Sequence, residues 1–401
     1  MKSGGVPGLM EEAFNSIFQQ PPRFKVDVPA RICVFGEHSD YVPYLNAKVV
    51  TFASSEQRMS ALIRPRKDGF VKIASTLQGL ENRHTKFSIR ECKIEGDWLE
   101  ALDSRGPPAT HWSNYVKGAI AYLVNAQDVK NIDKGFDMLV DSNIPAASGA
   151  SSSSALTLCG MVAACLANDL SWSNSEMAEA AGKAEWFVGT RGGVMDHATM
   201  CLAEEGAMLE MEFRPLSAVP IEDCRKWKWY SVFTHPAEKS GGVREAFNEL
   251  AYVQQIVIPI HLETMGEFSD MSPEWVADVL PEFFEDLKLG RIRLRDRFNF
   301  VHNEYARVQA FISAMESADE DVLKNLLESS WNDTRTLLGT HTPEMEKVAE
   351  YYLKKEGVLG VKVLGAGFGG NLLICAKEGF DMGPDAIEHT PGAGLQLLEL
   401  D

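Results

Sequence analysis

The stretch from Asn143 to Ala155, which reads N-I-P-A-A-S-G-A-S-S-S-S-A, has the composition of an anion-binding turn. An apolar run over residues 155–167 follows it with the spacing of a buried helix. A turn that opens a helix presents free backbone N–H groups and the positive end of the helix dipole, and both attract phosphate. Serine hydroxyls also suit Mg²⁺. The alternative is a serine-rich helix cap or a linker, and no P-loop Gly-Lys-Ser/Thr signature follows.

Three other stretches collect polar or glycine residues where a pocket needs them. The first follows directly on an apolar strand pattern and comprises Glu37, His38, Asp40 and Tyr41. Such a group lines a pocket at a strand end or, alternatively, forms a polar hairpin loop. Residues 189–197, G-T-R-G-G-V-M-D-H, indicate a tight loop that ends near an aspartate. Residues 361–376 read as strand, glycine-rich loop and strand, which lets a ligand or another backbone approach closely.

Strands and helices must bring these stretches together, and hydrophobic spacing predicts both kinds of element. The predicted strands cover residues 32–35, 48–53, 59–64, 136–140, 206–213 and 229–233. The predicted helices cover residues 14–18, 111–126, 155–167 and 175–187, and the regions 244–315 and 319–355 are mainly helical by pattern. Ser175 is the predicted cap of the helix over 175–187. The predicted boundary between two domains lies near residues 205–235.

Composition narrows the class of protein. The 401 residues are enough for two domains, and 45% hydrophobic with 24% charged residues is ordinary for a globular protein. The net charge of −18 argues against a nucleic-acid or anionic-membrane surface. Seven scattered cysteines are typical of reduced thiols. Without a signal-peptide pattern or a membrane-length apolar stretch, we expect a cytoplasmic enzyme or sensor.

Four motifs occur in order along the chain: P-A-R-x5-E-H-S-D-Y from Pro29, N-I-P-x4-A-S-S-S-S-A from Asn143, G-G-V-M-D from Gly192, and L-G-A-G-F-G-G from Leu364. Together they resemble the GHMP kinase superfamily, and within it the galactokinase and N-acetylgalactosamine kinase branch. The resemblance runs from about residue 26 to residue 376, with further matches at residues 111–118, 184–196, 297–304 and 342–345.

The resemblance implies a fold and its division. The expected fold is α+β, with two domains and the active site in the cleft between them. The implied units are an N-terminal extension over residues 1–25, an N-terminal domain over 26–215 with the sugar motif and phosphate loop, and a C-terminal domain over 216–401.

The resemblance also implies a reaction. GHMP kinases move the γ-phosphoryl group of ATP to a small hydroxylated substrate, and galactokinase-like members make a sugar 1-phosphate. Asp196 would face the accepting hydroxyl, as general base or as an orienting carboxylate. Arg31 would hold Asp196 ionised and neutralise phosphoryl charge, so we expect the two close together. An aspartate of ordinary pKa is a weak base at neutral pH, and both roles of Asp196 therefore stay open.

The remaining site residues are assigned by the same resemblance. The residues expected to bind sugar hydroxyls are Glu37, His38 and Asp40, and Gly193 would contribute backbone to the sugar pocket. The residues expected to bind ATP are Trp112, Gly149, Ser151, Ser152 and Ser153. The wall expected to close over the phosphates is formed by Gly365, Gly367, Gly369 and Gly370. The residues expected to bind Mg²⁺ are Ser153 and Glu185. Trp112 reads equally as a core tryptophan, and Glu185 reads equally as a solvated helix residue.

The chain departs from the galactokinase pattern at several places. Ala30 stands for a glycine, Ser39 for a threonine, and His197 follows the aspartate where a glutamine is usual. Residues 239–243, K-S-G-G-V, lack a tyrosine that many galactokinases place against the sugar. These changes leave the sugar open, including a uronic acid whose carboxylate could meet Lys48 or Arg191.

The expected function is an ATP-dependent kinase that phosphorylates the anomeric hydroxyl of a galactose-like hexose. It is expected to act as a monomer, with Mg²⁺ and without a nucleic-acid or membrane partner. The alternative is a catalytically silent sugar and ATP sensor that binds a regulatory protein.

Overall fold

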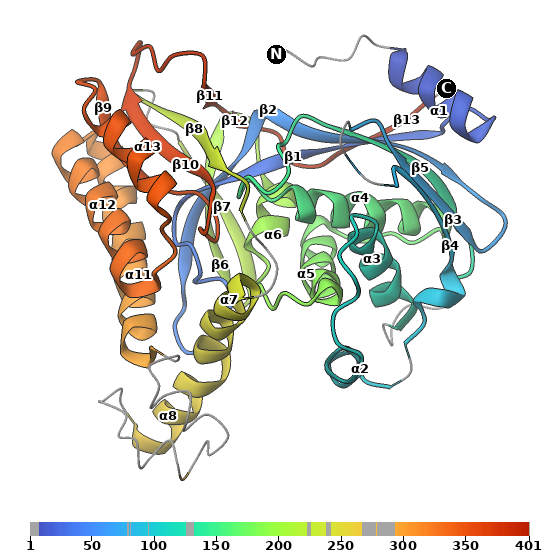
Figure 1. Cartoon of the computed structure of the whole chain (residues 1–401), viewed down its shortest axis with the longest axis horizontal. Coiled ribbons are helices and arrows are strands. Elements are labelled where there is room, and N and C mark those ends of the chain that lie inside the picture. The colour runs from blue at the N-terminus through green and yellow to red at the C-terminus, as the bar shows by residue number, and fades with distance from the viewer. Residues whose placement is uncertain are drawn as a thin grey trace.

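Two β-sheets frame the protein, shown in a computed structural model (Figure 1). The structure describes residues 8–77, 80, 82–94, 96–125, 132–222, 226–237, 242–266, 278 and 293–400. The larger sheet has the order β13-β1-β2-β5-β3-β4, with β6 and β12 paired to β2 and β7 paired to β6. Its strands are β1 (Phe24–Phe35), β2 (Lys48–Pro65), β3 (Phe70–Ser75), β4 (His84–Ser88), β5 (Phe136–Ser142), β6 (Ala207–Phe213), β7 (Leu216–Glu222), β12 (Pro391–Gly392) and β13 (Gln396–Glu399).

The smaller sheet has the order β11-β8-β10-β9 and is antiparallel throughout. Its strands are β8 (Trp227–His235), β9 (Val358–Val363), β10 (Gly370–Lys377) and β11 (Ala386–His389). The predicted pattern of strand, glycine-rich loop and strand over residues 361–376 is confirmed as β9, loop and β10.

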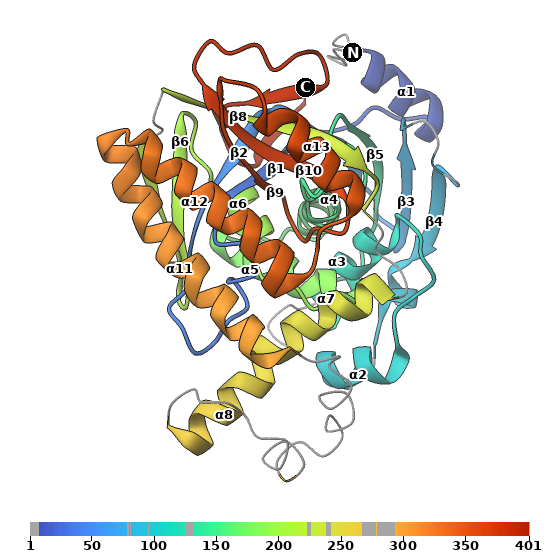
Figure 2. The same cartoon turned by 60° about the vertical axis from the view of Figure 1, so that its left-hand side comes forward.

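Helices cover one face of the larger sheet and one side of the smaller one. Beneath the larger sheet lie α3 (Asn114–Asn125), α4 (Ser152–Ala167), α5 (Asn174–Glu185) and α6 (Met195–Leu202) (Figure 1). Against the smaller sheet lie α12 (Glu320–Asp333) and α13 (Pro343–Leu353), with α11 (Leu294–Ser317) beside α12 (Figure 2). The other helical segments are α1 (Leu9–Phe18), η1 (Ile89–Cys92), α2 (Trp98–Arg105), η2 (Trp186–Val188), α7 (Gly242–Tyr252), η3 (Val253–Val257), α8 (Ile258–Met265) and η5 (Thr334–Leu338).

The last four residues of strand β1, residues 32–35, are an unbroken apolar run before the polar motif. Cys33 belongs to the core beneath the larger sheet, whereas Ile32, Val34 and Phe35 belong to the core shared with the smaller sheet and α11. A strand buried on both faces needs apolar side chains at successive positions rather than at alternate ones. β1 therefore carries Arg31 into the boundary between the part of the molecule built on the larger sheet and the part built on the smaller sheet.

Several sequence predictions need correction at the level of single elements. The two strands predicted over 48–53 and 59–64 are one strand, β2, because residues between them also pair: Ser54 pairs with Pro391 of β12 and Arg58 with Pro29 of β1. Helix α5 is capped by Ser173 and not by Ser175, since the Ser173 hydroxyl accepts the backbone N–H of Glu176. β7 was not predicted. Within the helical prediction over 244–315, residues 267–277 and 279–292 lie outside the described residues.

The proposed division at residue 215 remains a prediction. β7 follows that position and still pairs with β6 of the larger sheet. β12 and β13 also return to the larger sheet from the far end of the chain. A unit built on the larger sheet therefore takes residues from both sides of the proposed boundary.

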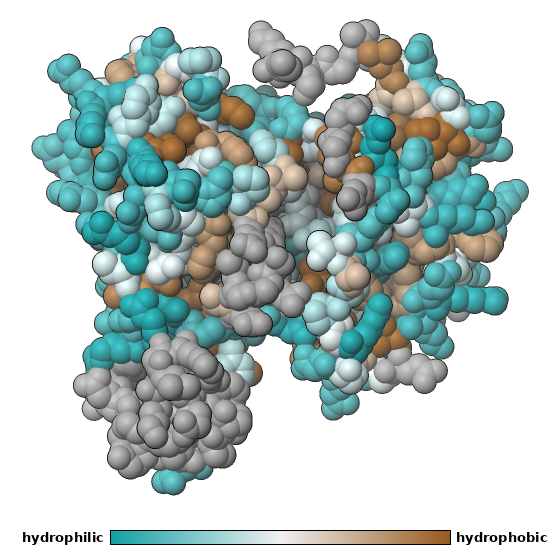
Figure 3. Space-filling view, viewed as in Figure 1, coloured by the Kyte–Doolittle hydropathy of each residue, from teal (hydrophilic) through white to brown (hydrophobic). Residues whose placement is uncertain are grey.

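The described cysteines and helices agree with two limited expectations. Six described cysteines are free and buried: Cys33, Cys92, Cys159, Cys165, Cys201 and Cys375. No helix among the described residues is both long and apolar enough to cross a membrane. Hydrophilic side chains cover most of the face shown in Figure 3.

Candidate active site

A cavity of about 170 Å³ brings the four motifs together. Its lining takes Arg31 from β1, Ser151 from the start of α4 and Asp196 from α6. Residues 365–368 of the glycine-rich loop and Phe247 of α7 complete it from the other half of the chain. The cavity therefore lies where the two halves meet, as the resemblance implies.

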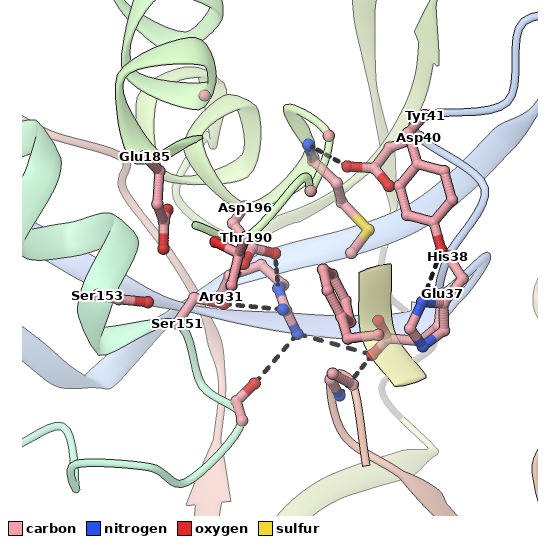
Figure 4. Close-up of a pocket in the computed structure, with 18 of the residues that line it drawn as sticks. Arg31, Glu37, His38, Asp40, Tyr41, Ser151, Ser153, Glu185, Thr190 and Asp196 are labelled. Atoms are coloured by element: carbon pink, nitrogen blue, oxygen red, sulfur yellow. Dashed lines mark hydrogen bonds and ion pairs between the residues drawn. The ribbon is translucent and has the colours of Figure 1, made fainter. Parts of the chain in front are cut away.

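Arg31 and Asp196 form the centre of this cavity (Figure 4). The Arg31 Nε donates to Asp196 Oδ1 at 2.6 Å, which confirms the predicted closeness. Arg31 Nη2 donates to the Ser151 hydroxyl at 2.8 Å, and that hydroxyl donates to Asp196 Oδ2 at 2.5 Å. Arg31 Nη1 donates to the Gly149 carbonyl at 3.3 Å. One guanidinium thus fixes both the aspartate and the serine-rich turn before α4, residues 148–151, which is called the phosphate turn below after its predicted ligand.

Burial and charge act in opposite directions on this pair. Burial raises the pKa of Asp196, but the Arg31 charge and the hydrogen bonds from Arg31 and Ser151 outweigh it, and the pKa lies below its ordinary value. Burial lowers the pKa of Arg31, and the charges of Asp196 and Glu37 outweigh that effect. Asp196 is ionised at neutral pH and is held by a permanent cation.

The E-H-S-D-Y motif lies on the other side of Arg31 from Glu185 and Ser153 (Figure 4). His38 has a left-handed backbone with φ 63°, and its Nδ1 lies 2.9 Å from the Tyr41 hydroxyl. Burial lowers the pKa of His38, which favours a neutral ring at pH 7. Asp40 Oδ2 accepts the backbone N–H of Met195 at 2.9 Å. These side chains line the cavity beside the Arg31–Asp196 pair.

Asp40 supplies a pH-dependence prediction. Burial raises the pKa of Asp40 to about 6, although the Met195 N–H opposes the shift. Only the ionised carboxylate can accept hydrogen bonds from hydroxyl groups at both of its oxygens. The kcat/KM for the acceptor is therefore expected to rise with pH between about 5 and 7. Initial rates at limiting acceptor across that range measure it. Asp40→Asn should remove this limb, and a limb that persists in the variant contradicts the prediction.

Gly193 supplies a second prediction. A Cβ at this position would lie 2.2 Å from Asp40 Oδ2, so any side chain must displace the acid. Because a shift of about 1 Å in a positioning group can cost about 100-fold, Gly193→Ala is expected to raise the acceptor KM at least about tenfold. The KM for ATP should change far less. Gly192→Ala is the matched control, since its Cβ would meet only the Phe247 ring tip at 3.8 Å. Equal KM values for the two variants would contradict the prediction.

The phosphate turn and the glycine-rich loop contact each other. A Cβ on Gly149, whose φ is 79°, would lie 2.2 Å from the Leu364 carbonyl oxygen. The Asn371 N–H donates to the Ser148 carbonyl at 2.7 Å. Helix α4 begins at Ser152, so Ser152, Ser153 and Ser154 form its first turn and present its N-terminus to the cavity region. This geometry suits phosphate, and the assignments of Gly149, Ser151 and Ser153 stay predictions.

Two predicted nucleotide residues lie outside the cavity lining. Ser152 is half-buried in the first turn of α4 and is not among the lining residues. Trp112 packs against the core beneath the larger sheet, and its indole N–H donates to the Asn82 carbonyl at 3.3 Å. The structure therefore does not bring Trp112 to Arg31 and Asp196, and an adenine contact for it stays a prediction.

Glu185 lies on the phosphate side of the cavity, at the end of α5. The Ser154 hydroxyl donates to Glu185 Oε2 at 2.8 Å, and His197 Nε2 lies 3.0 Å from the same oxygen. Ser153 lines the same side. Within the described part of the chain, no group of three or more acidic, histidine or cysteine side chains could hold a metal. Mg²⁺ bound chiefly by ATP phosphates needs only one or two protein oxygens, and Glu185 with a serine hydroxyl fits that need.

The two cations considered for a uronic acid have other partners. Lys48 lies 2.6 Å from Glu210 and 3.0 Å from Glu212. Arg191 lies 2.5 Å from Asp103 and donates to the Trp186 carbonyl at 3.0 Å. Neither is among the residues that line the cavity, and a contact of either with a uronic acid stays a prediction. Lys239 to Gly241 of the K-S-G-G-V stretch lie outside the described residues.

Several residues of the site were missed from the sequence. Tyr115, Thr190 and Phe247 line the cavity. Tyr115 stands in the H-W-S-N-Y stretch and Thr190 beside the glycines of residues 189–193, so both had a motif as a signal. Phe247 sits on α7 without any motif, and its ring lies 5.9 Å from that of His38. Only the tertiary structure brings it there.

Comparisons with known proteins agree with this architecture. A family profile described as GHMP kinases N terminal domain matches residues 114–204. The galactokinase of Lactococcus lactis subsp. cremoris is 28% identical over 382 residues, covering 92% of this chain and 87% of that protein. The galactokinase of Homo sapiens is 26% identical over 386 residues, covering 94% and 89%.

Solved structures show the same fold. A Lactococcus lactis galactokinase complexed with galactose matches with a TM-score of 0.75 at 23% identity, covering 96% of this chain and 98% of that one. A mevalonate kinase matches with a TM-score of 0.56 at 14% identity, covering 88% and 91%. The profile match shows a GHMP kinase N-terminal domain over residues 114–204, and the fold of nearly the whole chain is the one seen in galactokinase and mevalonate kinase structures. Galactokinases are homologues of the chain over most of its length.

Proposed function

We propose that the protein is an ATP-dependent sugar 1-kinase that phosphorylates the anomeric hydroxyl of galactose or a galactose-like hexose. The observation that carries this proposal is the Arg31–Asp196 pair, with Nε and Oδ1 2.6 Å apart, in a cavity lined by the acceptor motif and by both glycine-containing loops. The galactokinase homologues along most of the chain support the same acceptor class.

The chemistry assigned to the pair follows from its charges. Phosphoryl transfer needs an oriented nucleophile and neutralised phosphoryl oxygens more than it needs covalent help from the protein. Asp196 orients the acceptor hydroxyl or accepts its proton, and Arg31 stabilises charge on the transferring group. The lowered pKa of Asp196 makes it a weaker base and favours the orienting role.

The acceptor and the nucleotide are assigned to opposite sides of Arg31. Glu37, His38, Asp40 and Gly193 are assigned to the sugar hydroxyls, and Gly149, Ser151 and Ser153 to the phosphates. Mg²⁺, held by Glu185 and a serine hydroxyl, would supply charge neutralisation on the ATP phosphates. We further propose that the protein acts as a monomer in the cytoplasm, and the six free, buried cysteines are consistent with a reducing compartment.

The test is ADP release from Mg·ATP with a panel of free sugars: galactose, N-acetylgalactosamine, galacturonic acid, glucuronic acid, glucose, mannose and fucose. Mevalonate serves as the non-sugar control. Turnover with a sugar, and a phosphate product that is labile to acid but stable to alkali, supports the proposal. ATP binding without turnover on any sugar would contradict it and favour the silent sensor.

A further inference from the structure

Lys362 is a fully buried lysine inside the smaller sheet. It lies on β9 between the apolar residues Val361 and Val363, and only 1% of its side chain is exposed. Burial of an ammonium group costs several kcal/mol unless other groups compensate the charge. An apolar side chain would pack at this position without that cost, so the partners of Lys362 indicate what its charge does.

The partners of Lys362 come from both halves of the molecule. Its Nζ donates to the Val363 carbonyl at 2.7 Å and to the Cys33 carbonyl of β1 at 3.3 Å. Its third direction faces the Glu37 carboxylate, with Nζ 3.9 Å from Oε1. Lys362 thus crosses from the smaller sheet to the strand that carries Arg31.

Glu37 is held by three groups at one oxygen. Oε1 accepts the Gly365 backbone N–H at 2.7 Å and lies 3.6 Å from Arg31 Nη1, in addition to its contact with Lys362. Gly365 belongs to the glycine-rich loop, so this carboxylate joins that loop to the acceptor motif. These three contacts at Oε1 fix the Glu37 carboxylate in the cavity that it lines.

The charge of Lys362 also balances the charges of the carboxylates around Arg31. Arg31 faces two carboxylates, Asp196 and Glu37, whose side chains lie on opposite sides of its guanidinium. One cation against two acids leaves one negative charge, and Lys362 brings the four groups to neutrality. The shorter contact of Arg31 is the one to Asp196, at 2.6 Å against 3.6 Å for Glu37.

We propose that Lys362 is a positioning residue for phosphoryl transfer. It holds Glu37 against the glycine-rich loop, so that Arg31 stays free to interact with Asp196 and with the phosphoryl group. Without the lysine charge, Glu37 draws Arg31 away from Asp196, and the acceptor loop loses a tie to the nucleotide side. This inference rests on the proposed kinase function.

The experiment compares Lys362→Met, which keeps the length without the charge, with Lys362→Arg, which keeps the charge. We expect Lys362→Met to lower kcat at least about tenfold and to raise the acceptor KM, and Lys362→Arg to stay within about threefold of the unmodified protein. Thermal melting of all variants shows whether they fold. A Lys362→Met protein that melts at a changed temperature but keeps kcat and acceptor KM overturns the inference.

A double-mutant cycle separates positioning from general damage. In a Glu37→Gln background the carboxylate charge is gone, so Lys362→Met should cost much less there than in the unmodified protein. An equal loss in both backgrounds overturns the inference. If Lys362→Met does not fold, Lys362→Gln takes its place with the same expected loss. Failure of the unmodified protein to phosphorylate any sugar would refute the proposed function instead, and the two failures are therefore distinguishable.

Discussion

Asp196→Asn is expected to lower kcat by at least about 1000-fold while ATP binding stays within a few-fold of the unmodified protein. The substitution keeps the size of the side chain and removes the charge that Arg31 and Ser151 hold at 2.6 and 2.5 Å. An amide neither accepts the hydroxyl proton nor attracts the hydroxyl as a carboxylate does. ADP release measures turnover, and nucleotide titration by calorimetry measures binding.

Asp68→Asn is the matched control for this variant. Asp68 also pairs with an arginine, since its Oδ2 lies 2.7 Å from Arg66 Nη2, but it does not line the cavity and its side chain is 48% exposed. Its replacement should leave kcat unchanged. Turnover near the unmodified level in Asp196→Asn would refute the assigned role of Asp196 whatever the control shows.

Arg31→Met is expected to lower both activity and stability. The variant leaves Asp196 and Glu37 without their shared cation, and a broken buried pair typically costs about 3–5 kcal/mol in the free energy of unfolding. Loss of the phosphoryl-facing charge should also reduce kcat by at least about 100-fold. Urea unfolding and ADP release measure the two effects separately.

Two comparison variants sharpen the Arg31 prediction. Arg31→Lys keeps a charge but cannot reach Asp196, Ser151 and Gly149 at once, so stability should recover more than kcat does. Arg23→Met removes an exposed arginine that pairs with Glu399 at 3.1 Å, and its unfolding free energy should fall by less than about 1 kcal/mol. An unfolding free energy in Arg31→Met equal to that of Arg23→Met would contradict the importance given to the buried pair.

The sequence predicted the closeness of Arg31 and Asp196 better than it predicted the bounds and caps of the elements around them. Arg31 and Asp196 stand 165 positions apart and meet as expected, because four motifs in order carry the information about their spacing. The cap of α5 was misplaced by two residues because the capping box formed by Ser173 and Glu176, three residues apart in the sequence, was overlooked.

Other features have no local signal at all. Lys362 reads as an ordinary surface residue of an alternating strand, and only the tertiary structure places its Nζ beside the Cys33 carbonyl of β1. Phe247 reaches the cavity because α7 folds back onto the acceptor motif, which depends on contacts between distant segments. Ser151 was assigned to phosphate, whereas its hydroxyl bridges Arg31 and Asp196 in the structure.

The pairing of β13 with β1 has a consequence for biosynthesis. β1, which carries Arg31, lies between β2 and β13, and Gln396–Glu399 form the ladder on its outer side. Leu400 packs with Phe14 of α1 in the same region. Those residues are translated after all the other described strands of both sheets, so the strand that carries the arginine acquires its second neighbour after its first. Ribosome-bound chains that stop before residue 396 should therefore expose an unpaired edge of β1 to chaperones.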